Sequence, residues 1–363
     1  MAFGSEPVGA GEIAAALAPW FIAHQRTMSW RGRTDPYAIW VSEVMLQQTR
    51  VETVERYYTK FLDRFPDTFA LAAADDDAVL AAWSGLGYYR RARMLHLGAK
   101  VVAERFGGRM PEQAEQLREI PGIGPYTAGA IASIAFDRPE PLVDGNVARV
   151  LSRVNAIEDV ARQGANAKQH WQLVAEIVRE GSPRVLAQAL MELGATVCTP
   201  RSPRCMACPL FASCRARKLG IVDRVPAPKQ RGVLPRERWW ALAIVRDERL
   251  LVVRRPGEGL LAGMWCLPLV AIDEGDVSGA PDPALLRAAI GVDAVLGPAH
   301  AVVEHVFTHL AWELYPVRCD VGDTPVLPGI GEGSVAWIAG GERPHGGVPS
   351  VLRKLLRPLG WAA

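Results

Sequence analysis

The chain has 363 residues, of which 49% are hydrophobic and 22% charged, and its formal net charge is +2. This composition excludes a disordered chain, and the length predicts two or three compact domains. The first residues lack a basic segment followed by an apolar run, and no apolar run approaches the roughly 20 residues that span a bilayer. We therefore expect a cytoplasmic protein with no membrane partner.

Charge is distributed unevenly along the chain. Residues 201–240 contain ten Lys/Arg and two Asp/Glu, a local charge of +8, which leaves 31 against 37, or −6, for the remainder. A concentrated positive stretch suits phosphate binding. A solvated linker rich in charge is the alternative.

Apolar residues recur at three- and four-residue spacings from about Glu12 to Ala195. The pattern is clearest in Asp75–Trp83, Ala92–Phe106 and Trp171–Val178. This period predicts amphipathic helices, so the first half of the chain is expected to be all-α.

A proline- and glycine-containing stretch, 225–232, follows the helical region and is typical of an extended linker. Beyond it, short β-prone runs, one alternating segment and a closing helix predict an α+β domain. These elements are Trp239–Val245, Leu250–Arg255, Ala311–Val321 and Val348–Leu356.

The first motif with chemical interest follows Asp35 and Pro36, which predict a helix start. Glu43 then falls among mostly apolar neighbours, such as Val44 and Met45. A carboxyl in such surroundings is expected to have a raised pKa, which suits a general acid. The alternative is a glutamate on the solvent face of the helix.

A glycine turn lies within Leu117–Ala128, which reads LREIPGIGPYTA. Gly122 and Gly124 permit a tight turn, and Pro125 suits the first position of the following helix. Backbone N–H groups at that helix start would bind a phosphate oxygen. The motif predicts a hairpin between two helices that grips a DNA backbone without reading sequence; a plain interhelical turn is the alternative.

Asp144 stands just before the helix-forming run that starts at Gly145, so an N-cap is one interpretation of it. A carboxylate close to the DNA-gripping hairpin could instead stabilise the positive charge that develops on a sugar as its base departs.

Four of the six cysteines lie within seventeen positions, and this clustering favours metal ligation over disulfides. Their spacing has only one close pair, whereas a structural zinc site usually presents two, so a [4Fe–4S] cluster fits better than zinc or unligated thiols. The four are Cys198, Cys205, Cys208 and Cys214. Cys266 and Cys319 are expected to be buried thiols.

The hairpin, glycine turn, aspartate and four-cysteine loop, in this order, resemble the helix-hairpin-helix glycosylase superfamily that includes endonuclease III, over residues 10–220. Within it, SEVMLQQT, VDGNVARVLSR and the appended second domain look like the adenine DNA glycosylase (MutY) family. The resemblance implies an all-α helix-hairpin-helix domain at 8–223, including an iron–sulfur loop at 198–214. A linker at 224–237 and an α+β Nudix-like domain at 238–363 would follow.

The implied activity is excision of adenine opposite 8-oxoguanine or guanine in double-stranded DNA, by a monomer that would be associated with the nucleoid in a bacterium. Glu43 would protonate N7 of adenine, Asp144 would support the oxocarbenium-like sugar, and Tyr126 and Asn146 would assist. Endonuclease III-like enzymes carry a lysine, which forms a Schiff base with the sugar, at the position that matches Tyr126. A phenol cannot form that imine, so the resemblance implies a monofunctional enzyme.

The target base must leave the stack to be reached, so the family resemblance also implies a base pocket. Gln48 and Tyr88 look like residues that fill the opened stack, although Trp30 and Tyr88 could equally be core aromatics. The positions that match the pocket are Arg26, Trp30, Arg31, Leu46 and Gln188.

The second domain resembles a Nudix-like recognition domain, with Arg255-Pro256 and Gly263-Met264-Trp265 near its start. The magnesium-binding hydrolase signature is absent, so recognition is expected rather than hydrolysis. Phe307, Thr308 and His309 match a Phe-Ser-His segment that contacts 8-oxoguanine, with threonine in place of serine.

Three other functions compete with this interpretation. A thymine- or damaged-pyrimidine-specific relative shares the helical scaffold but does not explain the second domain. A non-enzymatic lesion-binding protein does not explain the pair Glu43 and Asp144. A nucleotide pyrophosphatase would need the metal-binding signature that this sequence lacks.

Overall fold

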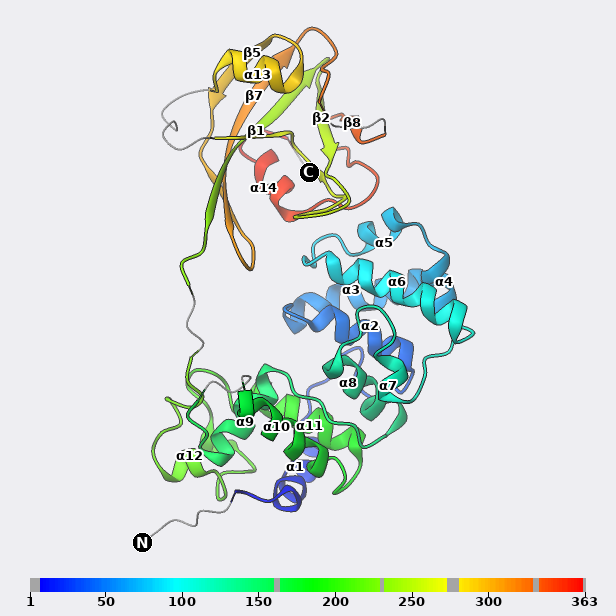
Figure 1. The fold of residues 1–363 in the computed structure, drawn as a ribbon, viewed down its shortest axis with the longest axis vertical. Helices are drawn as coiled ribbons and strands as arrows, with labels where there is room; N and C mark the ends of the chain where they lie inside the picture. Colours follow the sequence, from blue (N-terminus) through cyan, green and yellow to red (C-terminus); the bar gives the residue numbers. More distant parts are fainter. Residues whose placement is uncertain (1–6, 160–163, 229–231, 273–280, 329–332, 362–363) are drawn as a thin grey trace. The chain divides into compact units, whose positions relative to one another are not determined.

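The structure, a computed structural model, describes residues 7–159, 164–228, 232–272, 281–328 and 333–361. It divides into two compact units (Figure 1). The helical unit comprises the described residues of Met1–Ala73 and Met94–Gln230, and the sheet unit those of Ala74–Arg93 and Arg231–Ala363. Every regular element described before residue 229 is a helix.

The helices of the helical unit are α1 (Ala10–His24), α2 (Pro36–Leu46), α3 (Val51–Arg64), α4 (Thr68–Ala73), α7 (Ala114–Leu117), α8 (Pro125–Phe136), α9 (Gly145–Asn155), α10 (Gly164–Ile177), α11 (Pro183–Thr196), the 3₁₀ turn η1 (Cys205–Ala207) and α12 (Arg215–Lys218). Helix α6 (Arg90–Arg105) begins in the sheet unit and continues in the helical unit.

Helix α2 forms the centre of the helical unit. It starts where the sequence predicts, because the Asp35 carboxylate accepts bonds from the backbone N–H groups of Tyr37 and Ala38, at 3.2 Å each. Pro36 occupies the first helical position. All residues from Tyr37 to Met45 are buried, so this short helix is enclosed on every side.

The sheet unit contains α5 (Asp76–Ala82) and a mixed sheet of eight strands with two helices. The core strand order is β3-β2-β1-β7-β5, while β4 pairs with β1, β6 with β7, and β8 with β2. The elements are β1 (Arg236–Arg246), β2 (Arg249–Arg254), β3 (Trp265–Cys266), β4 (Leu269–Ala271), α13 (Pro283–Ile290), β5 (Ala294–Ala299), β6 (Val303–Val306), β7 (Ala311–Val321), β8 (Val335–Ile338) and α14 (Ser350–Leu356).

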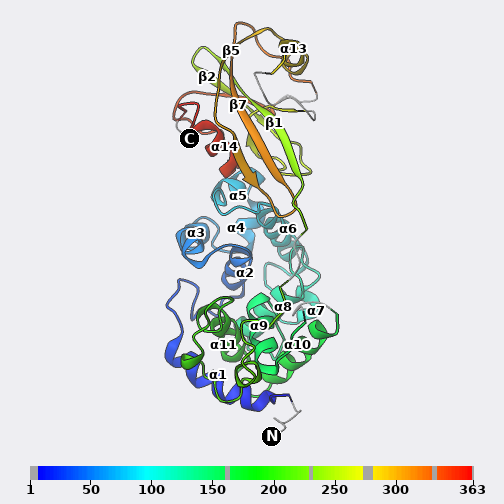
Figure 2. The same ribbon diagram turned by 90° about the vertical axis from the view of Figure 1, so that its left-hand side faces the viewer.

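The long strands β1 and β7 run parallel, from the pair Arg236 and Ala311 to the pair Val245 and Asp320. Alternate residues of β1 enter two separate cores, one with α14 and the other with α13. Figure 2 shows these two helices on opposite sides of the strands. The sheet is therefore covered on both faces.

Part of the stretch predicted as a linker packs onto the helical unit. Val225 is 1% exposed and joins a small cluster with Ala216 and Ile221. The backbone N–H of Ala227 donates to the carbonyl of Glu158 at 2.9 Å. Residues 229–231 lie outside the described residues, and β1 begins at Arg236.

The predicted fold classes are confirmed. The strand expected at 311–321 coincides with β7, and the closing helix expected at 348–356 is α14 from Ser350. The thiols of Cys266 and Cys319 are buried as expected. Among the described helices, none is long and apolar enough to cross a membrane.

Candidate active site

Glu43 lies on α2 with 6% of its surface exposed, so the alternative that placed it on a solvent face is wrong. The hydroxyl of Tyr126 donates a hydrogen bond of 2.8 Å to its Oε2. Burial raises the pKa of Glu43 to about 7, while the bond from Tyr126 lowers it in part. A carboxyl with this pKa holds a proton close to neutral pH and is able to donate it.

Asp144 is the N-cap of α9, as one interpretation of the sequence predicted. Its Oδ1 accepts from the backbone N–H of Val147 at 2.7 Å, and its Oδ2 accepts from Nδ2 of Asn146 at 2.9 Å. Burial raises the pKa of Asp144, and these bonds and Arg149 oppose the rise. Its charge also raises the pKa of Glu43, so the capping carboxyl lies in the same site as the buried one.

The two carboxyls differ in what surrounds them. Asp144 is stabilised in its charged form by the backbone of Val147 and by the backbone and side chain of Asn146. Glu43 accepts from one neutral phenol and experiences the negative charge of Asp144. The proton therefore belongs on Glu43 and the charge on Asp144, an arrangement that separates an acid from an anion.

Tyr126 occupies the first turn of α8, where Pro125 sets the helix start. Burial, followed by the charges of Glu43 and Asp144, raises the pKa of Tyr126 well above its ordinary value. The sulfur of Met191 lies 3.1 Å from the hydroxyl oxygen. Tyr126 is thus a neutral donor to Glu43.

The two glycines of the turn before α8 are constrained differently. Gly122 has φ of +84°, and a Cβ there would lie 2.7 Å from Cβ of Met94, so only glycine fits. Gly124 is the N-cap of α8 with φ of −88° and no atom within 4 Å of its ideal Cβ position. Steric need explains the first glycine, whereas the open space at the second leaves room for a ligand.

Two of the predicted pocket residues meet at one buried carboxylate, and a third contacts one of these two. Arg26 and Arg31 both contact Glu192, with their shortest N–O distances at 2.6 Å and 2.7 Å. Nη1 of Arg31 also donates to Oε1 of Gln188 at 2.5 Å. The structure therefore brings together residues at positions 26, 31 and 188, and it adds Glu192.

The remaining predicted residues of the helical unit lie at its surface or in its core. Trp30 is 9% exposed and packs edge-on against Tyr58, with ring centroids 5.5 Å apart. Leu46 is half-buried at the end of α2. Gln48 is exposed and follows the end of α2 with φ of +57°.

Arg149 connects Asn146 to the cysteine loop. Its Nη2 donates to Oδ1 of Asn146 at 2.9 Å and to the carbonyl of Gly194 at 2.8 Å. Its Nε donates to the carbonyl of Cys198 at 2.9 Å. A continuous set of hydrogen bonds therefore runs from Asp144 through Asn146 and Arg149 to the first of the four cysteines.

The four cysteines of the loop are free thiols and half-buried. Burial raises the pKa of Cys208 to about 12, and the thiols of the other three cysteines raise it further, so all four lie within electrostatic range. Buried Arg153 holds the loop through bonds to the carbonyls of Thr199 and Pro200, at 2.7 Å and 3.2 Å. In the ranges described, no three His, Cys, Asp or Glu side chains form a group able to hold a metal ion.

The predicted recognition residues belong to the sheet unit. Phe307 is half-buried against Trp312, with ring centroids 4.8 Å apart, while Thr308 and His309 are exposed in the turn between β6 and β7. Tyr88 is 49% exposed and lies with φ of +49° between α5 and α6. The trio at 307–309 thus lies at the tip of the hairpin that β6 and β7 form.

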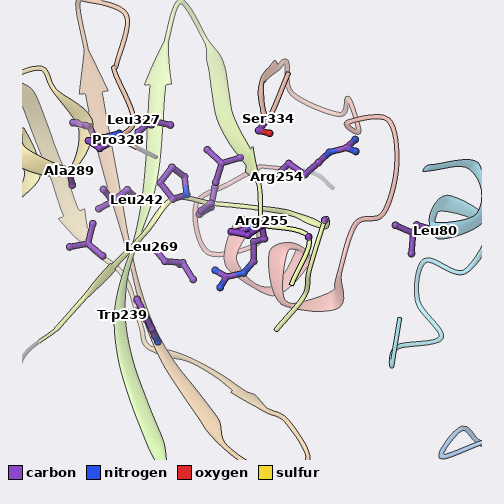
Figure 3. A pocket seen from close by; sticks show the side chains of 18 of the residues that line it. Leu80, Trp239, Leu242, Arg254, Arg255, Leu269, Ala289, Leu327, Pro328 and Ser334 are labelled. Atoms are coloured by element: carbon purple, nitrogen blue, oxygen red, sulfur yellow. The ribbon is translucent and has the colours of Figure 1, made fainter. Parts of the chain in front are cut away.

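The sheet unit also contains a cavity of about 830 Å³ (Figure 3). Its lining includes Arg254 and Arg255 at the end of β2 together with Trp239 and Leu269 of the sheet. Arg254 is paired with Asp77 at 2.7 Å, and Nε of Arg255 donates to the carbonyl of Leu260. Both arginines therefore have partners within the unit.

Some residues that pack against the site and hold its side chains in place were not predicted from the sequence. A Cβ at Gly129 would lie 1.9 Å from the carbonyl of Pro141, and one at Gly194 would lie 2.6 Å from Cβ of Asn146. Glu192 was missed because a glutamate on an amphipathic helix usually faces solvent. Its spacing from Gln188, four positions earlier, was the available signal.

Comparison with known proteins identifies both parts of the chain. Residues 41–176 match the HhH-GPD superfamily of base excision DNA repair proteins, and residues 239–358 match the NUDIX domain. A solved structure of a thermostable thymine-DNA glycosylase is 26% identical with a TM-score of 0.53, covering 58% of this chain and 97% of that protein.

Curated relatives extend over both units. The adenine DNA glycosylase of Homo sapiens is 35% identical, in an alignment that covers 94% of this chain and 73% of the human protein. The adenine DNA glycosylase of Arabidopsis thaliana is 34% identical, covering 90% of this chain and 60% of the plant protein. With such identity across both units, the chain belongs to the adenine DNA glycosylase family.

Proposed function

We propose that this protein is a monofunctional N-glycosylase that removes adenine opposite 8-oxoguanine, or opposite guanine, from double-stranded DNA. The observation that carries the proposal is the pair of carboxyls at one site, with the pKa of buried Glu43 raised to about 7 and Asp144 held by three donors. Family membership supports adenine as the base and DNA as the partner.

In this mechanism Glu43 donates its proton to N7 of an adenine that has left the stack. The bond between C1′ of the sugar and N9 breaks, and its electron pair leaves with the base. The anionic Asp144 stabilises the positive charge that develops on the sugar. Water then adds to C1′ and releases a proton, which gives free adenine and an abasic site, while solvent reprotonates Glu43.

Tyr126 and Asn146 assist without bonding covalently to the sugar. Tyr126 donates to Glu43 and thereby orients the carboxyl, and Asn146 donates to Asp144. Because a phenol cannot form a Schiff base, the DNA strand would remain intact until alkali cleaves it at the abasic site.

DNA would bind the helical unit through its glycine turn and its basic stretch. The turn at Gly122 and Gly124 ends at the N-terminus of α8, where backbone N–H groups suit a phosphate. Gln48 and Tyr88 would fill the space left by the flipped base, and Arg26, Trp30, Arg31, Leu46 and Gln188 would enclose that base. Phe307, Thr308 and His309 would contact 8-oxoguanine.

Cys198, Cys205, Cys208 and Cys214 would hold a [4Fe–4S] cluster. Their free thiols, their mutual electrostatic influence and their position in one loop support this assignment. Such a cluster would supply iron–thiolate bonds that fix the basic loop Thr199–Arg204. Protein prepared anaerobically should contain iron and acid-labile sulfide, and their absence would contradict the assignment.

The experiment that tests the function is single-turnover base release from three duplexes: adenine opposite 8-oxoguanine, adenine opposite guanine, and thymine glycol opposite adenine. Each is analysed with and without alkali. We expect adenine release with strand breaks mainly after alkali. Release from the thymine-glycol duplex alone, or efficient breakage without alkali, would instead place the activity with endonuclease III-like enzymes.

A further inference from the structure

Helix α11 presents Met191 and Glu192 on the same face as Gln188, three and four positions further along the chain. Gln188 contacts Arg31, Met191 contacts Tyr126, and Glu192 contacts both Arg26 and Arg31. Glu192 is only 2% exposed. A buried carboxylate with two arginines is costly to desolvate, so its retention calls for an explanation.

Each oxygen of Glu192 is used. Oε1 accepts from Nε of Arg26 at 2.6 Å and from its backbone N–H at 3.2 Å. Oε2 accepts from Nη2 of Arg31 at 2.7 Å and from Nη2 of Arg26 at 3.1 Å. One carboxylate thus fixes two guanidinium groups that come from the segment between α1 and α2.

We propose that Glu192 is a positioning residue for base release, which holds Arg31 and Arg26 in the pocket and prevents Arg31 from pairing with Glu43. This inference rests on the proposed role of Glu43 as the acid. Either Glu192 or Glu43 could neutralise the positive charge of Arg31. Glu43 must stay protonated for the reaction, whereas Glu192 need not. Because Glu192 pairs with Arg31, Glu43 remains neutral.

Charges around Glu43 support this division of roles. Tyr126 on α8 donates to Glu43, Asp144 at the start of α9 raises its pKa, and Arg31 lowers it. Arg31 is itself mostly buried, with 13% of its side chain exposed. Without Glu192, the positive charge of Arg31 would favour the ionised form of Glu43 more strongly, and the acid would be lost at lower pH.

Glu192 also sets the orientation of Gln188 through Arg31. Nη1 of Arg31 donates to Oε1 of Gln188, and Nε2 of Gln188 donates to the carbonyl of Arg184 at 3.0 Å. These bonds fix which end of the amide is donor and which is acceptor. One amide hydrogen and one lone pair of Gln188 remain for a purine edge.

The test measures single-turnover adenine release against pH in the full-length protein. In Glu192→Gln, the alkaline midpoint of the rate should move to lower pH, and each pH unit of movement lowers the rate above the midpoint about tenfold. Arg31→Gln should move the midpoint in the opposite direction. The double variant Glu192→Gln with Arg31→Gln should return the midpoint towards that of the unchanged protein.

The matched control is Glu112→Gln, which removes an exposed carboxylate from its ion pair with Arg138. It should leave the midpoint unchanged. A Glu192→Gln protein with a lowered melting temperature but an unchanged midpoint would show a merely structural role and overturn the inference. If that variant fails to fold, an Arg31→Gln midpoint that stays fixed or falls would overturn it equally.

Glu43→Gln separates this inference from the proposed function. If Glu43→Gln released adenine at the unchanged rate, the role of the acid would be wrong and the role of Glu192 would fall with it. If Glu43→Gln is inactive while the Glu192→Gln midpoint does not move, only the positioning role is overturned.

Discussion

The carboxyls of the helical unit and the turn at 307–309 of the sheet unit are held in opposite ways. Glu43 and Asp144 are fixed by hydrogen bonds to Tyr126, Asn146 and Val147 within the unit. Thr308 and His309 are exposed, and only their neighbour Phe307 is anchored, against Trp312. The chemistry of base release is thus preorganised in the protein, whereas the proposed lesion contacts would form when DNA binds.

The largest expected effect comes from removing the acid. Glu43→Gln keeps the shape of the side chain but cannot donate a carboxyl proton, so base release should fall by about 10²–10⁴-fold. DNA affinity should change little, because the affected group is buried. Single-turnover release and duplex binding, measured side by side, check both statements; unchanged release would exclude Glu43 as the acid.

A second large effect is expected from the packing behind Asn146. A Cβ at Gly194 would lie 2.6 Å from Cβ of Asn146 and 3.0 Å from its backbone. Gly194→Ala should therefore cost roughly 1–3 kcal/mol, or about 2–12 °C in melting temperature, and should slow base release by displacing the donor to Asp144.

The control for Gly194→Ala is Gly145→Ala, one position from Asp144, where no atom lies within 4 Å of the ideal Cβ position. Its melting temperature should not fall. Equal losses in both variants would show that proximity to Asp144, rather than close packing, is responsible.

The residues behind these two effects, Glu43 and Gly194, differ in how much of their role could be predicted from the sequence. Apolar neighbours predicted the burial of Glu43, and Asp144 before a helix predicted the cap. The contacts of Glu192 and Gly194 join α11 to segments more than 40 positions earlier, and no local pattern specifies such partners. Local period and caps therefore predicted the elements and the acid, whereas tertiary packing determined the residues that hold the acid in place.

A third effect, spread over a range of pH, concerns the stability of the folded protein. Burial raises the pKa of folded Glu43 from 4.5 to about 7, so the folded state binds its proton more tightly than the unfolded state does. The contribution to stability is present below about pH 4.5 and is lost as pH rises through about 7, in total about 3 kcal/mol. Glu43→Gln cannot ionise, so its melting temperature relative to the unchanged protein should rise between about pH 4.5 and 7 and stay level at higher pH.

The comparison for that measurement is Glu112→Gln, whose carboxylate is exposed. Its difference in melting temperature from the unchanged protein should stay constant over the same pH range. A constant difference for Glu43→Gln as well would mean that the folded protein does not hold the Glu43 proton more tightly.

The smallest expected effect lies in the exposed turn. Thr308→Ala removes one hydroxyl, and the loss of one hydrogen bond is worth about 0.5–1.5 kcal/mol, so the preference for 8-oxoguanine over guanine opposite adenine should fall about 2–10-fold. Thr308→Ser keeps the hydroxyl and should retain the preference. Both should melt like the unchanged protein, because Thr308 is exposed.

Phe307→Ala completes the contrast within the same turn. The Phe307 ring packs against both Trp312 and His305, so its removal should lower the melting temperature of the sheet unit as well as the preference for 8-oxoguanine. Preference measured as the ratio of single-turnover rates on the two duplexes separates recognition from stability. An unchanged ratio in Thr308→Ala and His309→Ala would exclude the turn from lesion recognition. The packing of Phe307 would then serve stability alone.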